Sequence, residues 1–289
     1  MVRRSTIEIT FSHGVFATSS STRPVCCATK GVLIFPRPVQ HAAAQIQACV
    51  CLRLRAVHAK RTSLIDVRSK GAIQLVILRM HLGSRDDQAI RGECLITGST
   101  VWGKPVAEHH PSIESTLQYL RQRRSSFGEY ARLLVSVSLA GRWYTSLKGG
   151  NHKDAYAVGA KCKPFEFGTG LEELGSRVTA CTEQHYAAHV TREEWREVMS
   201  TYEGSAGLAF VFDSELTLYA KVCKARNVLK DVRPIGLAVF DAEFDDWSNT
   251  CTSWNKFGNY TLMRTARKSV DAIGALNATH VLNCATLPK

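Results

Sequence analysis

The sequence predicts an α/β fold in which parallel strands are joined by helical crossovers. Short, nearly continuous apolar runs at residues 72–78, 133–139 and 235–240 are typical of strands that are covered on both faces. Segments with the apolar spacing of helices lie between these runs and after the last one. Parallel neighbours require such crossovers, so the order strand, helix, strand, insert, helix, strand and helix favours a parallel sheet.

The first helix is predicted to open at Pro111, between the first and second strands. Ile113, Leu117 and Leu120 recur at a spacing that puts them on one face of this helix. Basic residues that begin with Arg121 stand near its end, where the helix dipole favours positive charge.

The elements after the second strand are less regular. Gly141 ends that strand, and residues 143–212 follow with a mixed pattern and Gly-containing turns. Residues 216–229 form an amphipathic pattern that leads to the third strand, and a last helix is predicted at residues 260–273. Residues 143–212 therefore form the insert in the alternation of strands and helices.

Residues 1–70 show no comparable pattern. They mix apolar, Ser, Thr and Arg residues without a sustained period, and no Asp or Glu occurs from Ile9 to Ile65. We expect this basic part to belong to no recognisable domain, to be poorly ordered and to be unable to supply further strands. Residues 71–289 are expected to form the folded part.

The net charge of +12 is concentrated toward the N-terminus. Residues 1–130 hold 18 Lys and Arg against 8 Asp and Glu, whereas residues 131–289 hold 19 against 17. A basic arm can bind nucleic acid or anionic surfaces. No nucleic-acid motif accompanies the charge, so an unstructured or non-native leader is favoured over a nucleic-acid partner.

The signals for cell location are mixed. The start of the chain has basic residues but lacks the apolar core of a signal peptide. No apolar run of about 18 residues occurs, so no membrane span is predicted. Two N-glycosylation sequons, which begin at Asn259 and Asn277, agree with a secreted protein.

Ten cysteines are present, and they lack the close CxxC or HxxxH spacing of zinc sites, so neither a metal nor another cofactor is predicted. Widely spread cysteines fit the disulfides of a secreted domain better. Cys162 and Cys181 form one plausible couple within the insert, and Cys223 and Cys251 form another around the third strand. Four cysteines nevertheless allow three connectivities.

Three stretches within residues 71–275 share one resemblance. "VSVSLAGRWYT" ends a strand in a Gly-Arg pair, "VFDSELTLYAKVCKARN" joins an apolar-aromatic-Asp step to a helix, and "LAVFDAEFDDW" ends a strand in acids that include Asp245 and Asp246. They resemble the end of strand seven, the exit from an insertion and the end of strand eight in glycoside hydrolase family 18, the chitinases and chitinase-like lectins. Phe240 stands where that family has Trp.

The resemblance implies the last strands and helices of a (β/α)8 barrel, with a small α+β insertion at about residues 143–212. It also implies an extracellular protein whose partner is chitin or a chito-oligosaccharide. Carbohydrate binding would then involve Arg142, Trp143, Tyr144 and Phe240, the last of which keeps an apolar floor in place of the Trp.

The catalytic residues of the family are not retained. Its proton-donating Glu lies in a D-x-x-D-x-D-x-E motif on strand four, and this sequence contains no such motif. Its strand six ends in Met-x-Tyr-Asp, whereas here the strand ends in Met80-His81, and we expect His81 to be a surface or loop histidine. The acids around Asp241 are expected to end the strand, cap the following helix and pair with nearby bases. Without a proton donor, we expect cleavage to lack the acid catalysis that is usually worth about 10²–10⁴-fold.

Three functions remain open from the sequence. The favoured one is a catalytically degenerate chitinase-like protein, either a lectin-type binder or a truncated gene product. The second is an active enzyme of the substrate-assisted kind, whose acid would be Asp241 or Glu243. The third is a basic interaction protein that acts through residues 1–70.

Overall fold

A computed structural model gives the structure of the protein. It describes residues 8–10, 31–34, 49–53, 75–83, 94–107, 110–122, 132–150, 152–164, 173–229, 236–274 and 283–287.

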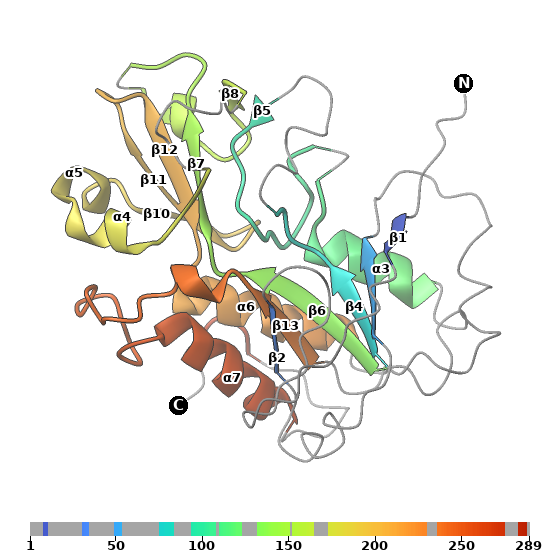
Figure 1. The fold of residues 1–289 in the computed structure, drawn as a ribbon. Helices are drawn as coiled ribbons and strands as arrows, with labels where there is room; N and C mark the ends of the chain where they lie inside the picture. The colour runs from blue at the N-terminus through green and yellow to red at the C-terminus, as the bar shows by residue number, and fades with distance from the viewer. Residues whose placement is uncertain are drawn as a thin grey trace, which may run out of the picture.

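The main sheet has six strands, and its four central strands are parallel (Figure 1). This arrangement confirms the predicted α/β class and the parallel pairing of the three predicted strands. The two edge strands are antiparallel to their neighbours. From edge to edge the strands are β1 (Glu8–Thr10), β3 (Cys49–Arg53), β4 (Leu75–Arg79), β6 (Arg132–Ser138), β13 (Gly236–Phe240) and β2 (Gly31–Ile34).

Strands β1, β2 and β3 lie within residues 1–70, where the sequence predicted none. They are three to five residues long and pair through backbone N–H and C=O groups, which every residue except proline carries. The expectation that this part of the chain could not supply strands was wrong. These strands are too short to show a periodic pattern in the sequence, which is why they were not predicted.

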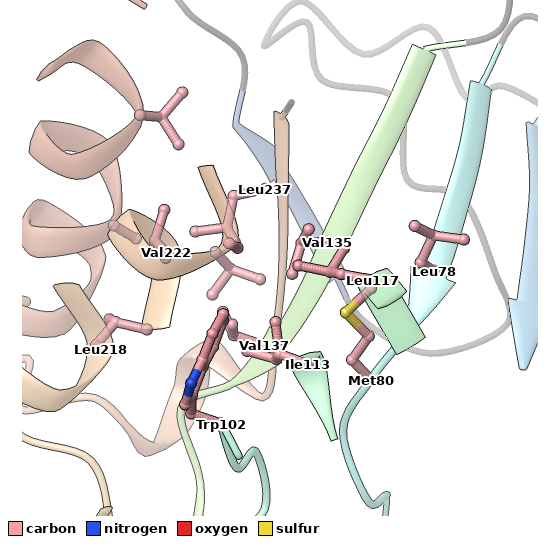
Figure 2. Close-up of a cluster of buried hydrophobic side chains, with 14 of the residues drawn as sticks. Leu78, Met80, Trp102, Ile113, Leu117, Val135, Val137, Leu218, Val222 and Leu237 are labelled. Atoms are coloured by element: carbon pink, nitrogen blue, oxygen red, sulfur yellow. The ribbon is translucent and has the colours of Figure 1, made fainter. Parts of the chain in front are cut away.

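In the part of the chain that the structure describes, three helices cover one face of the main sheet: α3 (Ile113–Gln122), α6 (Glu215–Val228) and α7 (Thr261–Gly274). Their apolar residues pack with Leu78, Val135, Val137 and Leu237 in one buried cluster (Figure 2). Because side chains alternate across a strand, Ser136 and the other residues between these positions face the opposite side of the sheet. The main core thus lies between the helices and one face of β4, β6 and β13.

The three helices and two of the three strands fall close to their predicted positions. α3 begins two residues after Pro111, and the bounds of α6, α7, β6 and β13 differ by at most one residue from those predicted. β4 begins at Leu75, and residues 72–74 of the predicted strand lie outside the described residues.

The segment predicted as an insert builds a second, antiparallel sheet, which stands at one end of the main sheet (Figure 1). Its strands, in spatial order, are β10 (Thr191–Glu193), β11 (Val198–Glu203), β12 (Leu208–Phe212), β7 (Gly141–Thr145) and β9 (Leu174–Gly175). Short helices accompany it: η3 (Lys153–Tyr156), α4 (Val178–Thr182) and α5 (Gln184–Ala187). The remaining elements in the described residues are β5 (Cys94–Leu95), β8 (Lys161–Cys162) and η4 (Ala242–Phe244).

Three disulfides join the described parts: Cys94–Cys162, Cys181–Cys251 and Cys223–Cys284. All four candidate cysteines are bonded, but the proposed couples Cys162–Cys181 and Cys223–Cys251 are wrong. The bonds follow spatial neighbours instead, with Cα atoms 5.0–5.8 Å apart. The pairing of β5 with β8, for example, sets Cys94 directly opposite Cys162.

Candidate functional site

The carboxyl ends of the parallel strands β4, β6 and β13 meet at one edge of the main sheet, the edge at which α/β proteins place their ligands. Polar side chains gather there on the face opposite the helices. His81 follows β4, Ser136 and Ser138 lie at the end of β6, and Asp241 follows β13. We call these four residues the edge cluster.

Ser138 and Asp241 form the first half of the edge cluster. The Ser138 hydroxyl donates a 2.6 Å hydrogen bond to Oδ2 of Asp241 and accepts the N–H of Ala140 at 3.2 Å. Asp241 has a φ of 57°, in the left-handed region that few residues other than glycine adopt. Its side chain is half-buried and can still be reached from solvent.

The environment of Asp241 raises the pKa of its carboxyl group. Burial raises the pKa of its carboxyl group, and the negative charge of Glu243 raises it further, while the Ser138 hydrogen bond and the charges of Arg79 and Arg142 act in the opposite direction. The burial effect is the largest, so Asp241 holds a proton at higher pH than an ordinary aspartate.

His81 and Ser136 form the second half. Nδ1 of His81 lies 2.8 Å from the Ser136 hydroxyl, which also accepts the N–H of Met80 at 2.7 Å. The imidazole packs on Phe240, with ring centroids 4.4 Å apart. A surface or loop histidine was expected; His81 does follow the end of β4, but it is only 4% exposed, so a surface position is wrong. A ring held by a buried serine and an aromatic face is instead part of the sheet's interior.

Arg142 and Tyr144 lie on the same face of β7 and are both buried. Arg142 pairs with Glu173, donates from Nε to the Tyr144 hydroxyl at 3.1 Å and donates from Nη1 to the carbonyl of Gly83 at 3.2 Å. The Tyr144 hydroxyl donates to the carbonyl of Thr97 at 2.9 Å. These bonds tie β7 to the segments that follow β4, and the charge of Arg142 reaches Asp241.

Trp143 points to the other face of β7, into the core of the insert. Its indole stacks on Phe210 at 4.3 Å and meets Tyr186 edge-on at 5.2 Å. A Cβ atom at Gly175 would lie 2.4 Å from the indole nitrogen, so Gly175 is needed for this close approach. The four residues predicted to bind carbohydrate thus divide: Phe240 packs with the edge cluster, and Trp143 packs in the insert.

Asp245 and Asp246 accept hydrogen bonds from the backbone. Asp245 accepts the N–H groups of Leu262 and Met263 at 3.3 and 2.9 Å, so it caps α7, as predicted. Asp246 is buried, which opposes ionisation, but the N–H groups of Cys251 and Thr250 lower the pKa of its carboxyl group overall. Glu243 is exposed.

Ser136 and Ser138 were not singled out from the sequence. Their signal was the alternation of Val135, Ser136, Val137 and Ser138 within an apolar strand. A polar residue at every second position of a strand that is buried on both faces indicates a polar site on one of them.

Two searches of the described residues gave negative results. No group of three His, Cys, Asp or Glu side chains in these parts of the chain is arranged to hold a metal ion. Within the same parts, no helix combines the length and the apolar character that crossing a membrane requires.

Comparison with known proteins gives matches in structure only. The sequence matches no protein-family model and no curated protein. The structure is similar to YKL-39, solved in the presence of chitooligosaccharides, with a TM-score of 0.54 and 13% identity over 77% of this chain and 57% of that chain. It is also similar to two chitinases of Ostrinia furnacalis. For catalytic domain 2 of the Group II chitinase the TM-score is 0.55 at 12% identity, over 82% of this chain and 58% of that chain.

The second Ostrinia furnacalis protein is the Group IV chitinase, solved in complex with allosamidin. Its TM-score is 0.56 at 13% identity, over 83% of this chain and 61% of that chain. The chain therefore spans about three-fifths of the length of these neighbours. At such identities the similarity shows the fold: the neighbours are chitinases and chitinase-like proteins.

Proposed function

We propose that this chain is a chitinase-like protein that binds chito-oligosaccharide at the edge cluster and does not cleave it. The observation that carries the proposal is the Ser138–Asp241 pair beside Phe240 at the carboxyl edge of β6 and β13. The similar structures of YKL-39 and the Group IV chitinase were solved with chitooligosaccharides and with allosamidin. These features support a sugar ligand at this edge of the sheet.

The chemistry of the edge cluster suits such a ligand. N-acetylglucosamine presents hydroxyl and amide N–H groups, and Asp241 offers carboxylate oxygens in a half-buried position. Phe240 packs against the ring of His81 in the edge cluster, while Arg142 and Tyr144 hold the segments around the site. The absence of a D-x-x-D-x-D-x-E motif from the sequence removes the usual proton donor.

The architecture and compartment follow from the same resemblance. We propose that residues 71–289 correspond to the last part of a (β/α)8 barrel, with an insertion at residues 143–212. The parallel order of β3, β4, β6 and β13 supports this view, although the antiparallel pairing of β2 with β13 departs from a barrel of parallel strands. Three disulfides support an oxidising, extracellular location.

Isothermal titration with chitotetraose tests the binding proposal. We expect heat of binding with the full chain, and a loss of at least tenfold in affinity for Asp241→Ala and Phe240→Ala. Trp195→Ala is the matched control, because Trp195 is 83% exposed in the turn between β10 and β11. No heat with the folded wild-type protein, or equal losses in all three variants, contradicts the proposal.

Hydrolysis is the second candidate, because burial raises the pKa of Asp241 and a raised carboxyl pKa is a common property of catalytic acids. A fluorogenic chitobioside distinguishes the two. If Asp241 is the acid, release of the fluorophore is abolished in Asp241→Asn and retained in Glu243→Gln. A rate that survives both substitutions excludes this candidate, and no rate in the wild-type protein supports binding without cleavage.

A further inference from the structure

We propose that Asn259 carries an N-linked glycan and that the glycan is attached before α7 packs against α6. The sequence provides the acceptor motif Asn259-Tyr260-Thr261, which marks surface loops of secreted proteins. The structure adds two observations that the motif alone lacks: an open surface around Asn259 and a buried side chain at Thr261.

The surroundings of Asn259 leave room for a bulky modification. The residue is exposed in the loop that precedes α7, and its amide oxygen accepts a hydrogen bond from Arg264 at 2.9 Å in an exposed contact. A Cβ atom placed on the neighbouring Gly258 would meet no atom within 4 Å. The neighbouring Tyr260, with a φ of 53°, also leaves 46% of its surface exposed.

The compartment required for the reaction agrees with the covalent structure. N-glycosylation takes place along the secretory route, in the oxidising environment in which disulfides form and persist. One of the three disulfides, Cys181–Cys251, holds the loop that ends at Asn259. The same chain segment would therefore receive a disulfide and a glycan in one compartment.

The third residue of the sequon determines the timing. Thr261 is fully buried, and its hydroxyl donates a 2.6 Å hydrogen bond to Oε1 of Glu215 on α6. Arg177 holds the same carboxylate through two bonds of 3.0 and 3.1 Å. In the folded protein a transferase cannot reach this hydroxyl. The transferase can therefore bind the sequon only while α7 is not packed against α6.

The reaction is a transfer from a lipid-linked oligosaccharide diphosphate. The amide nitrogen Nδ2 of Asn259 attacks the anomeric carbon, the bond between that carbon and the diphosphate oxygen breaks, and the lipid diphosphate leaves. The nitrogen loses one proton to a base of the transferase. No oxidation or reduction is involved.

Translation of the full chain, with a secretory signal supplied, into microsomes tests the site. We expect a band that N-glycosidase treatment lowers, and a loss of one glycan in Asn259→Gln. Thr261→Ser is the matched control, because it keeps both the acceptor motif and a hydroxyl for Glu215, and it should remain glycosylated. If Asn259→Gln carries as many glycans as the wild type, the proposal is overturned. This holds whether or not the second sequon, at Asn277, is modified.

A second arm tests the timing and does not depend on any carbohydrate-binding function. The purified, oxidised, folded chain is offered to solubilised microsomal transferase with a lipid-linked donor, beside the same chain after reduction and denaturation. We expect transfer to Asn259 only in the denatured sample. Equal transfer to the folded sample would overturn the claim that burial of Thr261 closes the site.

Discussion

The hydroxyl of Ser138 donates to the carboxylate of Asp241 across 2.6 Å and so joins the ends of two parallel strands that lie 103 residues apart in the chain. Burial raises the pKa of this carboxyl group, and the hydrogen bond from Ser138 acts in the opposite direction. Asp241 also has a left-handed backbone conformation, which is uncommon for a residue with a side chain. The edge cluster thus combines local strain with an unfavourable place for negative charge, as sites of function often do.

Asp241→Asn is expected to stabilise the protein at neutral pH. The folded-state pKa of Asp241 is raised, so its ionisation lowers the free energy of unfolding as pH rises through that pKa. Asparagine accepts the same Ser138 hydrogen bond and tolerates a positive φ well. The gain should shrink as pH falls toward the ordinary aspartate pKa. Urea unfolding of both proteins at several pH values measures it; a gain that grows on acidification would contradict the raised pKa.

The three disulfides are expected to appear in a non-reducing digest as Cys94–Cys162, Cys181–Cys251 and Cys223–Cys284 peptides. Replacing both Cys223 and Cys284 by serine should lower the free energy of unfolding by about 2–5 kcal/mol, because the bond closes a long loop. Mass spectrometry identifies the pairs, and denaturant unfolding measures the loss. A Cys162–Cys181 peptide from the native protein would contradict the structure.

The strands and helices that the sequence predicted share one physical property: each buries apolar side chains with a regular period. Val135 and Val137 of β6 and Leu117 of α3 occupy one cluster of the core, and their spacing in the sequence indicates both the element and its buried face. The periodic pattern that indicates this burial lies within a few consecutive residues, so a short window of sequence was sufficient to predict each strand and helix.

The features that the sequence did not predict depend on distant pairing. His81 is buried because Ser136, 55 residues later, receives its imidazole and Phe240 packs on it. Cys94 meets Cys162 because β5 and β8 pair. Neither partner can be chosen from a local window, since cysteine and histidine have the same character whatever they contact. Strands β1 and β2 pair through backbone groups that nearly every residue carries, so the sequence holds even less information from which to predict them.

The buried ion pair of Lys221 and Asp213 links α6 to the end of β12. Lys221 is fully buried and donates to both carboxylate oxygens, at 2.6 and 2.8 Å, while Thr217 donates to the same carboxylate at 2.7 Å. Lys221→Met should cost about 3–5 kcal/mol, because it leaves a buried carboxylate without its cation. Lys221→Met with Asp213→Leu should recover much of that loss. Chemical denaturation of the single and double variants measures both.

The matched control for this pair is Arg267→Met on α7. Arg267 contacts Asp271 one helical turn later, and both side chains are partly exposed, so its loss should cost less than about 1 kcal/mol. Equal losses for Lys221→Met and Arg267→Met would show that the buried pair contributes no more than a surface pair.

Gly141 lies where β6 passes into β7, and the Phe210 ring packs directly against it. A Cβ atom at position 141 would come within 2.2 Å of the ring, and Phe210 is fully buried between its neighbours. Gly141→Ala should therefore lower the free energy of unfolding by about 1–3 kcal/mol through overpacking. Phe210→Leu in the same chain opens space at that point, so the double variant should lose less than the sum of the two single variants. Thermal unfolding followed by near-ultraviolet circular dichroism measures the three losses; strict additivity would mean that the Phe210 ring does not limit the residue at position 141.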